Sequence, residues 1–272
     1  MKIVLLCGNQ PNHIALAHKV AEKHELIGII IEEKPATGIT LFNAIPKFID
    51  KLLFSEINNA WHRLMQHYKN NYKGFPITEI FKTSSINSAR VVEIIERLKP
   101  DLAMVSGTSL IRKPLIEMKV QKGIINLHTG ISPYVKGGPN CTNWCIANDE
   151  FHLIGNTIMW LDAGIDSGNL IATETVDFTG HENLFEIHLK VMENAHQLYL
   201  KAVDQIKKDS SKCPSIKQKE IGEGKLYLTK MWGFSEKKAL LKNISEGRFS
   251  KIILSAEYRE KKNKLKLVKI SN

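Results

Sequence analysis

The sequence predicts an α/β fold with a mostly parallel sheet and a small β-rich appendage at the C-terminus. Over the first 206 residues, short apolar runs alternate with amphipathic helical patterns, which is typical of βαβ units whose strands pair in parallel. The 272 residues are enough to bury a full hydrophobic core. Residues 207–272 contain 18 of the 38 Lys and Arg residues but only 7 of the 28 Asp and Glu residues. We therefore expect two domains, a nearly neutral body at 1–206 and a small basic domain at 207–272.

The first βαβ unit comes at the start of the chain. Residues 3–7 are a continuous apolar run, as in a strand buried on both faces. Residues 8–12 contain turn-forming residues and Pro11, which suits the first turn of a helix. Apolar residues then recur at helical spacing, and residues 25–31 predict a second buried strand. This unit predicts a parallel pair of strands joined by a right-handed crossover.

The later elements continue this alternation. Residues 40–73 form a long amphipathic and partly basic helical pattern, which we expect to pack on the sheet rather than on a membrane surface. Residues 179–182 have the spacing of a capping box, which predicts the start of a long helix that runs toward Lys207. The other predicted elements are helices at 88–98 and just after 107–109, strands at 101–106, 123–128, 155–162, 170–176, 225–230 and 264–270, and a linker at 208–222.

Composition excludes several classes of protein. The apolar runs are far shorter than the roughly 20 residues of a membrane span, and the N-terminus lacks the pattern of a secretory signal. Four cysteines are too few for a disulfide framework, so we expect a reduced, cytoplasmic protein. The net charge of +10 favours a phosphate-bearing partner, although a solvated lysine-rich surface accounts for it equally well.

The first candidate catalytic residues lie at the end of the strand predicted at 123–128. Ligands of an open parallel sheet bind at the carboxyl ends of its strands. Asn126 and His128 lie there, and because one residue separates them, their side chains leave the strand on the same face. An amide beside an imidazole can polarise a carbonyl and move a proton, as acyl transfer requires. The alternative is that His128 is only a packing residue, because the pattern is short.

A second candidate site is the loop after residues 155–162. It carries Asp162 and Asp166 and contains Gly164 and Gly168. A carboxylate near a histidine orients the ring and raises its basicity. The alternative is that both aspartates only cap turns.

Two other patterns argue against a dinucleotide or a metal. The first turn has Gly8 but no G-x-G-x-x-G, so it does not match a dinucleotide-binding turn. Cys141 and Cys145 have no further ligands close in the sequence, so we expect them to be small buried residues on a helix with Trp144.

Together the two candidate sites resemble the family of 10-formyltetrahydrofolate-dependent formyltransferases. Asn126 and His128 precede Pro133 and the glycines at 137–138, as in the first motif of the family, and residues 155–168 resemble its second signature. The spacing between Asn126 and Asp166 also fits. The resemblance is strong over residues 105–176 and extends over the rest of the first 206. It implies a Rossmann-like formyltransferase fold.

The resemblance implies that Asn126, His128 and Asp166 form a catalytic triad for direct formyl transfer to an amine. Asn126 would donate a hydrogen bond to the formyl oxygen as it becomes an oxyanion. His128 would stabilise that charge or take a proton from the amine. Asp166 would orient His128 and assist proton transfer to the leaving nitrogen. The formyl donor would be N10-formyltetrahydrofolate, with no metal.

The resemblance also implies binding residues on both sides of the triad. A pterin slot would be lined by Met104, Ser106, Gly107, Leu110, Leu161, Asp162, Ala163, Gly164 and Ile165. The acceptor would contact Thr129, Ser132, Tyr134, Lys136, Gly137 and Gly138. The chain departs from the family pattern twice on the acceptor side: Gly130 stands where serine is frequent, and an extra residue, Val135, interrupts a common Tyr-Arg-Gly.

The family contains several acceptor classes. Sugar N-formyltransferases look closest, which implies a nucleotide-linked (dTDP, UDP or GDP) amino deoxysugar whose diphosphate the basic C-terminal residues help to hold. Methionyl-tRNA formyltransferase is the alternative, although 207–272 is short for its C-terminal domain, and glycinamide ribonucleotide formyltransferase has no insertion like 40–73. A formyltetrahydrofolate hydrolase and an RNA-binding module without catalysis also stay open. The resemblance further implies a homodimer, no membrane partner, and a role in lipopolysaccharide O-antigen biosynthesis.

Overall fold

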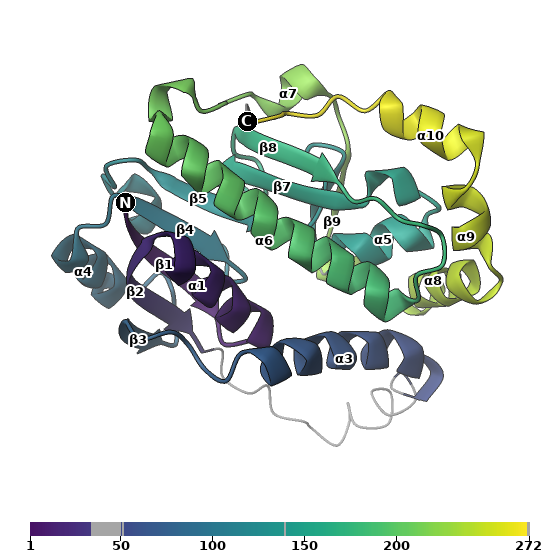
Figure 1. Cartoon of the computed structure of the whole chain (residues 1–272), viewed down its shortest axis with the longest axis horizontal. Helices are drawn as coiled ribbons and strands as arrows, with labels where there is room; N and C mark the ends of the chain where they lie inside the picture. Colours follow the sequence, from purple (N-terminus) through teal and green to yellow (C-terminus); the bar gives the residue numbers. More distant parts are fainter. Residues whose placement is uncertain (34–49, 51, 139, 271–272) are drawn as a thin grey trace.

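A seven-stranded sheet forms the centre of the computed structural model, which describes residues 1–33, 50, 52–138 and 140–270 (Figure 1). Its strand order is β3-β2-β1-β4-β5-β7-β8. Neighbours from β3 to β5 are parallel, whereas β7 pairs antiparallel with both β5 and β8. The strands are β1 Lys2–Gly8, β2 Glu25–Glu32, β3 Glu79–Thr83, β4 Leu102–Ser106, β5 Ile124–His128, β7 Gly155–Trp160 and β8 Leu170–Thr175. The α/β fold class with a mostly parallel sheet is confirmed.

Helices cover both faces of the sheet because its central strands are apolar on both sides. In β1, Ile3 and Leu5 pack in a core cluster with α1 and α6, whereas Val4 and Leu6 pack in a second cluster with α4. This alternation follows from the two-residue period of a strand. The helices are α1 Pro11–Lys23, α3 Ser55–Asn71, α4 Ala89–Leu98, α5 Cys141–Ala147, α6 Leu184–Lys208, α7 Gln218–Ile221, α8 Phe234–Ser245, α9 Arg248–Ile253 and α10 Ala256–Asn263.

The predicted elements of the first 206 residues are present, with local differences. The short helix expected after 107–109 is a single 3₁₀ turn at Leu115–Glu117. The capping box lies four residues later than expected: Asn183 caps the backbone N–H of Glu186 at the start of α6. Glu182 instead accepts hydrogen bonds from Thr179 and Gly180 in the preceding loop. The edge strand β3 was not predicted, because its residues are largely exposed and lack an apolar run.

The long helical pattern at 40–73 falls partly outside the described residues, which lack 34–49 and 51. The described part, α3, does not pack directly on the sheet. Leu64 and Tyr68 are fully buried against Ala15 of α1 and Met192 of α6, two helices that cover the sheet. The insertion therefore adds an outer layer to the body.

The C-terminal appendage is largely helical, and the prediction that it is β-rich is wrong. Among the described residues of the appendage, only Lys225–Tyr227 form a strand, β9, which pairs in parallel with β6 (Val135–Gly137). The alternating residues at 264–270 lie along the edge strand β8, where Val268 and Thr173 exchange two hydrogen bonds of 2.8 Å. The N–H of Val268 donates to the side chain of Thr173 rather than to its backbone. Residues 264–270 are therefore extended beside β8 but do not form a strand with it.

The appendage packs closely against the body. In Figure 1, α8, α9 and α10 lie beside α5 at one end of the molecule. One core cluster contains Trp144 of α5 and Ile187 of α6 together with Leu240 of α8 and Phe249 of α9. The predicted boundary after residue 206 lies inside α6, which continues to Lys208. The division into domains at 206 stays a prediction.

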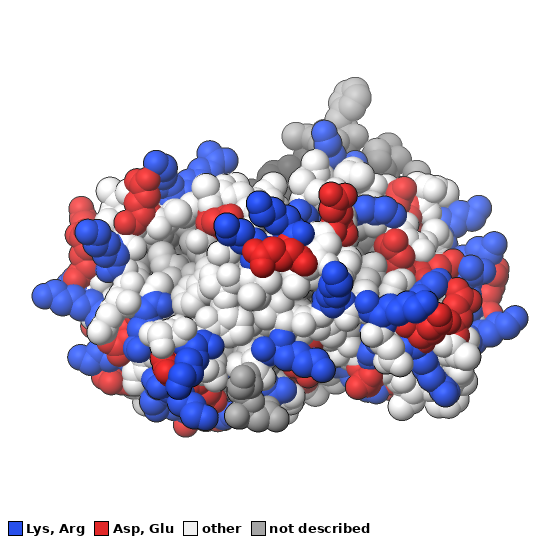
Figure 2. All heavy atoms as spheres, turned by 90° about the horizontal axis from the view of Figure 1, so that it is seen from above, with Lys and Arg blue, Asp and Glu red and all other residues white. Residues whose placement is uncertain are grey.

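Basic residues of the appendage are distributed over its surface. Figure 2 shows Lys and Arg side chains interspersed with Asp and Glu on the face it presents, with no continuous basic patch. Several pair with acidic residues of the body, such as Lys225 with Glu150 at 3.4 Å and Arg248 with Asp149 at 2.6 Å. In the part of the chain that the structure describes, no helix has the length and apolar character needed to cross a membrane.

Candidate active site

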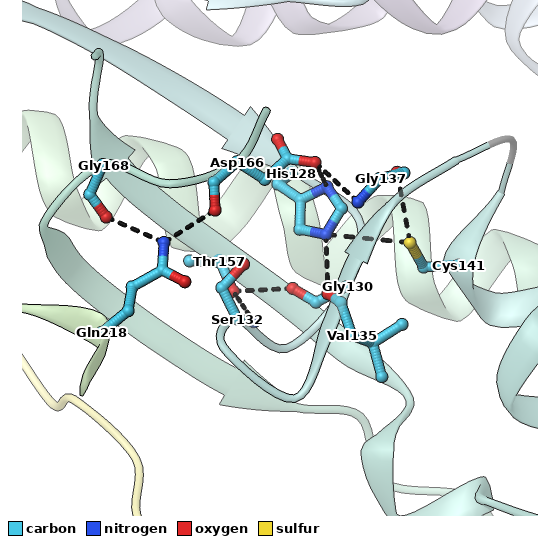
Figure 3. A network of polar contacts seen from close by, with 10 residues as sticks. All are labelled: His128, Gly130, Ser132, Val135, Gly137, Cys141, Thr157, Asp166, Gly168 and Gln218. Carbon is cyan, nitrogen blue, oxygen red and sulfur yellow. Dashed lines mark hydrogen bonds and ion pairs between the residues drawn. The ribbon is translucent and has the colours of Figure 1, made fainter. Parts of the chain in front are cut away.

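Two segments that are distant in the sequence meet at the end of β5. His128 ends β5, and Asp166 lies in the loop between β7 and β8. The imidazole Nδ1 of His128 is 3.2 Å from Oδ2 of Asp166 (Figure 3). Both side chains are largely buried, with exposed fractions of 7% and 14%. A buried ion pair of this kind fixes the orientation of the ring.

The Asp166 loop is held in an unusual conformation by contacts from two other segments. Asp166 has a φ of +47°, in the left-handed region that is uncommon for residues other than glycine. The backbone N–H of Gly137 donates to its Oδ2 at 2.9 Å. The amide of Gln218, from α7, donates to the carbonyl oxygens of Asp166 at 2.7 Å and Gly168 at 2.9 Å (Figure 3). These contacts hold the carboxylate against His128.

The second ring nitrogen of His128 also faces an acceptor. Its Nε2 is 3.0 Å from the carbonyl oxygen of Val135 and 3.7 Å from Sγ of Cys141. Burial alone would lower the pKa of His128, but the Asp166 carboxylate, the Cys141 sulfur and the Val135 carbonyl raise it to about 10. Because both nitrogens face acceptors, the ring is an imidazolium at neutral pH. It can stabilise a developing negative charge, but it has no lone pair to accept a proton.

The atoms around Gly130 explain why a glycine stands where serine is frequent in the family. A Cβ at this position would lie 2.5 Å from Nε2 of His128 and 2.8 Å from the carbonyl oxygen of Val135. No side chain fits there unless the imidazole or the backbone moves. The glycine is therefore required by the orientation of His128 in this chain.

Two pockets meet at these residues. The smaller, with a volume of about 280 Å³, is lined by Asn126 and Asp166. The larger, of about 680 Å³, is lined by His128. Gly107, just after β4, lines both. The residues predicted as a triad are thus divided between two adjacent pockets, as a reaction between two bound molecules requires.

Most residues predicted for the pterin slot do line the smaller pocket. These are Gly107, Leu110, Leu161, Asp162, Gly164 and Ile165. Ser106 lines the larger pocket instead, Met104 is fully buried in the sheet, and Ala163 is exposed in the same loop but not part of the lining. Oδ1 of Asp162 accepts hydrogen bonds from Gly164 N–H and Ser167 Oγ, so it also shapes the loop. Thr108 and Ser109, which lie within the predicted 104–110 strand and loop, also line this pocket, whereas Ile111, Met159, Trp160 and Ser167 were not predicted to line it.

Of the residues predicted to contact the acceptor, Thr129 lines the larger pocket. Gly137 contacts Asp166, as described above. The other four, Ser132, Tyr134, Lys136 and Gly138, line neither pocket. Ser132 is fully buried and donates its N–H to Thr157, and the N–H of Gly138 bonds to the carbonyl of Tyr227. In this structure these residues shape the loop around His128, and acceptor contacts from them stay a prediction.

The larger pocket is also lined by residues that were not predicted from the sequence. They are Gly8, Asn9, Gln10, Asn12 and His13 after β1, Glu32 and Glu33 at the end of β2, Leu127, Trp61 of α3 and Met192 of α6. The turn chemistry after the first strand could have indicated the first group, because ligands bind at the carboxyl ends of strands. Trp61 and Met192 carry no such signal, since they come from helices whose packing the sequence does not reveal.

Comparisons with known proteins identify the family. Residues 1–203 match the profile of the formyl transferase family. The methionyl-tRNA formyltransferase of Alkaliphilus oremlandii is 33% identical over 129 residues, which cover 47% of this chain and 40% of that protein. The chain thus spans less than half the length of the curated relatives it matches.

Solved structures share the fold at low sequence identity. A 4-N formyltransferase from Francisella tularensis superposes with a TM-score of 0.55 at 20% identity, covering 88% of this chain and 86% of that one. An N-formyltransferase from Helicobacter canadensis, solved with folinic acid and dTDP-3-aminofucose, gives 0.56 at 15% identity, covering 90% and 81%. Because the family profile matches about three quarters of its residues, this chain belongs to the formyl transferase family.

Proposed function

We propose that the protein is an N-formyltransferase that moves a formyl group from N10-formyltetrahydrofolate to the amine of a nucleotide-linked amino sugar. One observation carries the proposal: Asn126 and Asp166 line one pocket, His128 lines the adjoining one, and a buried ion pair connects His128 to Asp166. A donor in one pocket and an acceptor in the other would meet at these side chains.

The smaller pocket suits the flat ring of the donor. Leu110 and Ile165 both line it and are 41% and 43% exposed, which leaves apolar surface for a ring to cover. The folate supplies the formyl group when it is bound there. Backbone groups of the loops that contain Gly107 and Gly164 would hydrogen-bond the edge of the ring.

Each residue of the proposed triad then has a distinct task. The amide of Asn126 donates a hydrogen bond to the formyl oxygen, and the imidazolium of His128 stabilises the negative charge that develops on it. Asp166 keeps His128 charged and oriented. A bond forms between the acceptor nitrogen and the formyl carbon, the bond from that carbon to the donor nitrogen breaks, and the proton that the amine loses is balanced by one that the donor nitrogen gains.

The larger pocket favours a small acceptor that carries an amine. Its volume of about 680 Å³ lies in the range of small-molecule sites. Among its described lining residues are Glu32 and Glu33 but no Lys or Arg, so the lining offers acceptors for the N–H groups of an amine but no cation for a diphosphate. The expectation that C-terminal lysines hold a diphosphate has no support from this lining. The amino-sugar assignment is supported by the Helicobacter canadensis protein, whose complex contains dTDP-3-aminofucose.

Methionyl-tRNA is the second candidate acceptor, because the curated relatives that match about half of the chain are methionyl-tRNA formyltransferases. Incubation with 10-formyltetrahydrofolate and a panel of nucleotide-linked amino sugars, followed by mass spectrometry, tests the choice. We expect one sugar to gain one formyl group, and His128→Asn to abolish the gain while the protein still binds folate. Formylation of methionyl-tRNA with every sugar unmodified would reverse the choice, and release of formate without transfer would indicate a hydrolase.

A further inference from the structure

A second histidine lies close to the junction of the two pockets. His13, in the first turn of α1, is buried and lines the larger pocket together with His128. Its Nδ1 is 3.1 Å from the carbonyl oxygen of Gly8. A carbonyl only accepts, so Nδ1 carries the hydrogen of this bond. The Nε2 of a neutral ring therefore presents a lone pair, and the bond to Gly8 is the one hydrogen bond of this ring among the residues that the structure describes.

Gly107 determines where this nitrogen lies. A Cβ on Gly107 would be only 2.3 Å from Nε2 of His13, so the imidazole edge lies directly against the Gly107 backbone. Gly107 has a φ of +69°, and it lines both pockets. The free nitrogen of His13 is thus adjacent to the backbone that separates the donor side from the acceptor side.

The two histidines differ in protonation. Burial lowers the pKa of His13 to about 4, although its bond to the Gly8 carbonyl opposes the shift, so the ring is neutral at pH 7. His128 is charged, and both of its nitrogens face acceptors. Oδ2 of Asp166 already accepts from Gly137 and contacts His128. His13 thus offers a free acceptor for an N–H group, which His128 does not.

We propose that His13 is a further catalytic residue, whose Nε2 accepts a hydrogen bond from the acceptor amine and holds its nitrogen lone pair toward the formyl carbon. The inference rests on the proposed function in one respect, namely that the acceptor is an amine. The amine keeps its hydrogens in this contact. His13 acts before bond formation, by orientation, and its loss lowers the rate of transfer rather than the affinity for folate.

Two substitutions test the role of Nε2, which faces the pocket junction, separately from that of Nδ1, which bonds to the Gly8 carbonyl. His13→Asn retains a short amide that can donate to the Gly8 carbonyl but has no atom at the position of Nε2. His13→Gln reaches that position with an amide oxygen, which accepts an N–H. We expect His13→Asn to lower kcat about 100-fold with little change in folate affinity, and His13→Gln to retain activity within roughly ten-fold of the wild type. His24→Asn is the matched control, because His24 is a buried histidine at the opposite end of α1.

The assay uses the full chain with 10-formyltetrahydrofolate, each amino sugar and methionyl-tRNA, and folinic acid binding reports the donor pocket. Wild-type kcat in His13→Asn overturns the proposal, as do equal losses of kcat and folate binding in both His13 variants, which indicate a structural role. If the wild type formylates only methionyl-tRNA but His13→Asn is slow and His13→Gln active, the amino-sugar function fails and the role of His13 stands. Transfer to no amine at all overturns both.

Discussion

The charge on His128 links the stability of the protein to pH. Its pKa is about 10 in the folded protein, against 6.5 for a free imidazole. Between these values the folded state retains a proton that the unfolded state has released. The stabilisation is therefore complete below pH 6.5, and the free energy of unfolding falls by about 1.4 kcal/mol per pH unit as the pH rises from there toward 10. Urea unfolding of the wild type and of His128→Asn between pH 6 and pH 10 measures this loss of stability. The contributions of the other titrating groups cancel when the two unfolding free energies are subtracted. A difference that is constant with pH would contradict the ion pair with Asp166.

Gly130 gives a second prediction at the scale of single residues. The Cβ of Gly130→Ala would overlap Nε2 of His128 at 2.5 Å, so we expect the ring to be displaced and kcat to fall about 100-fold. Folate affinity should be preserved, because Gly130 does not line the smaller pocket. Gly74→Ala is the control, since a Cβ there meets nothing within 4 Å. Steady-state kinetics and folinic acid titration decide the matter, and unchanged kcat in Gly130→Ala would show that His128 tolerates displacement.

At the scale of elements, the segment expected to be a linker contributes to the site. Gln218, in the short helix α7, donates to the carbonyl oxygens of Asp166 and Gly168. Gln218→Ala removes both bonds, each worth about 0.5–1.5 kcal/mol, and releases a loop that holds Asp166 at positive φ. We expect kcat to fall roughly ten-fold with a smaller change in overall stability. Gln66→Ala is the control, because among the described residues that amide bonds only Asn70, on the exposed face of α3. Equal activity of the two variants would mean that the loop keeps its conformation unaided.

The same elements show how far the sequence determines the site. Asn126, His128 and Asp166 were selected because their spacing and the flanking glycines resemble the motifs of the family, whereas the strand end and the loop alone left a packing histidine and turn-capping aspartates as alternatives. Those signals are local. His13, Trp61 and Gln218 were not selected, because each reaches the site through the packing of a helix whose position depends on distant contacts. In the appendage, residues 225–227 form the strand β9 and residues 264–270 are extended, whereas the helices α8, α9 and α10 lie between them, where no element was predicted. Their apolar residues pack against α5 and α6, and the local sequence pattern does not reveal that packing.

At the scale of the whole molecule, the appendage shares a hydrophobic core with the body. Trp144 of α5 stacks on Tyr227 of β9 with ring centroids 4.4 Å apart. Phe249 of α9 lies edge-on to Phe151 and Phe178 of the body at 5.4 and 5.6 Å. The same region supplies Gln218 to the Asp166 loop. Because aromatic surface is buried across this boundary, we expect the two parts to fold together and the active site to depend on both.

This shared core predicts that the chain unfolds in one transition. Phe249 is 3% exposed, and Phe249→Ala should lower stability by about 3–5 kcal/mol through the cavity it leaves. Because its neighbours belong to the body, we expect calorimetry to show a single peak at lower temperature, with formyl transfer lost over the same range. Leu254, just after α9, is 55% exposed, so Leu254→Ala should change the unfolding temperature little. Two peaks, of which Phe249→Ala shifts only one, would instead mean that residues 207–272 fold as a separate domain, and the basic appendage would then be an accessory to a catalytic body that is stable without it.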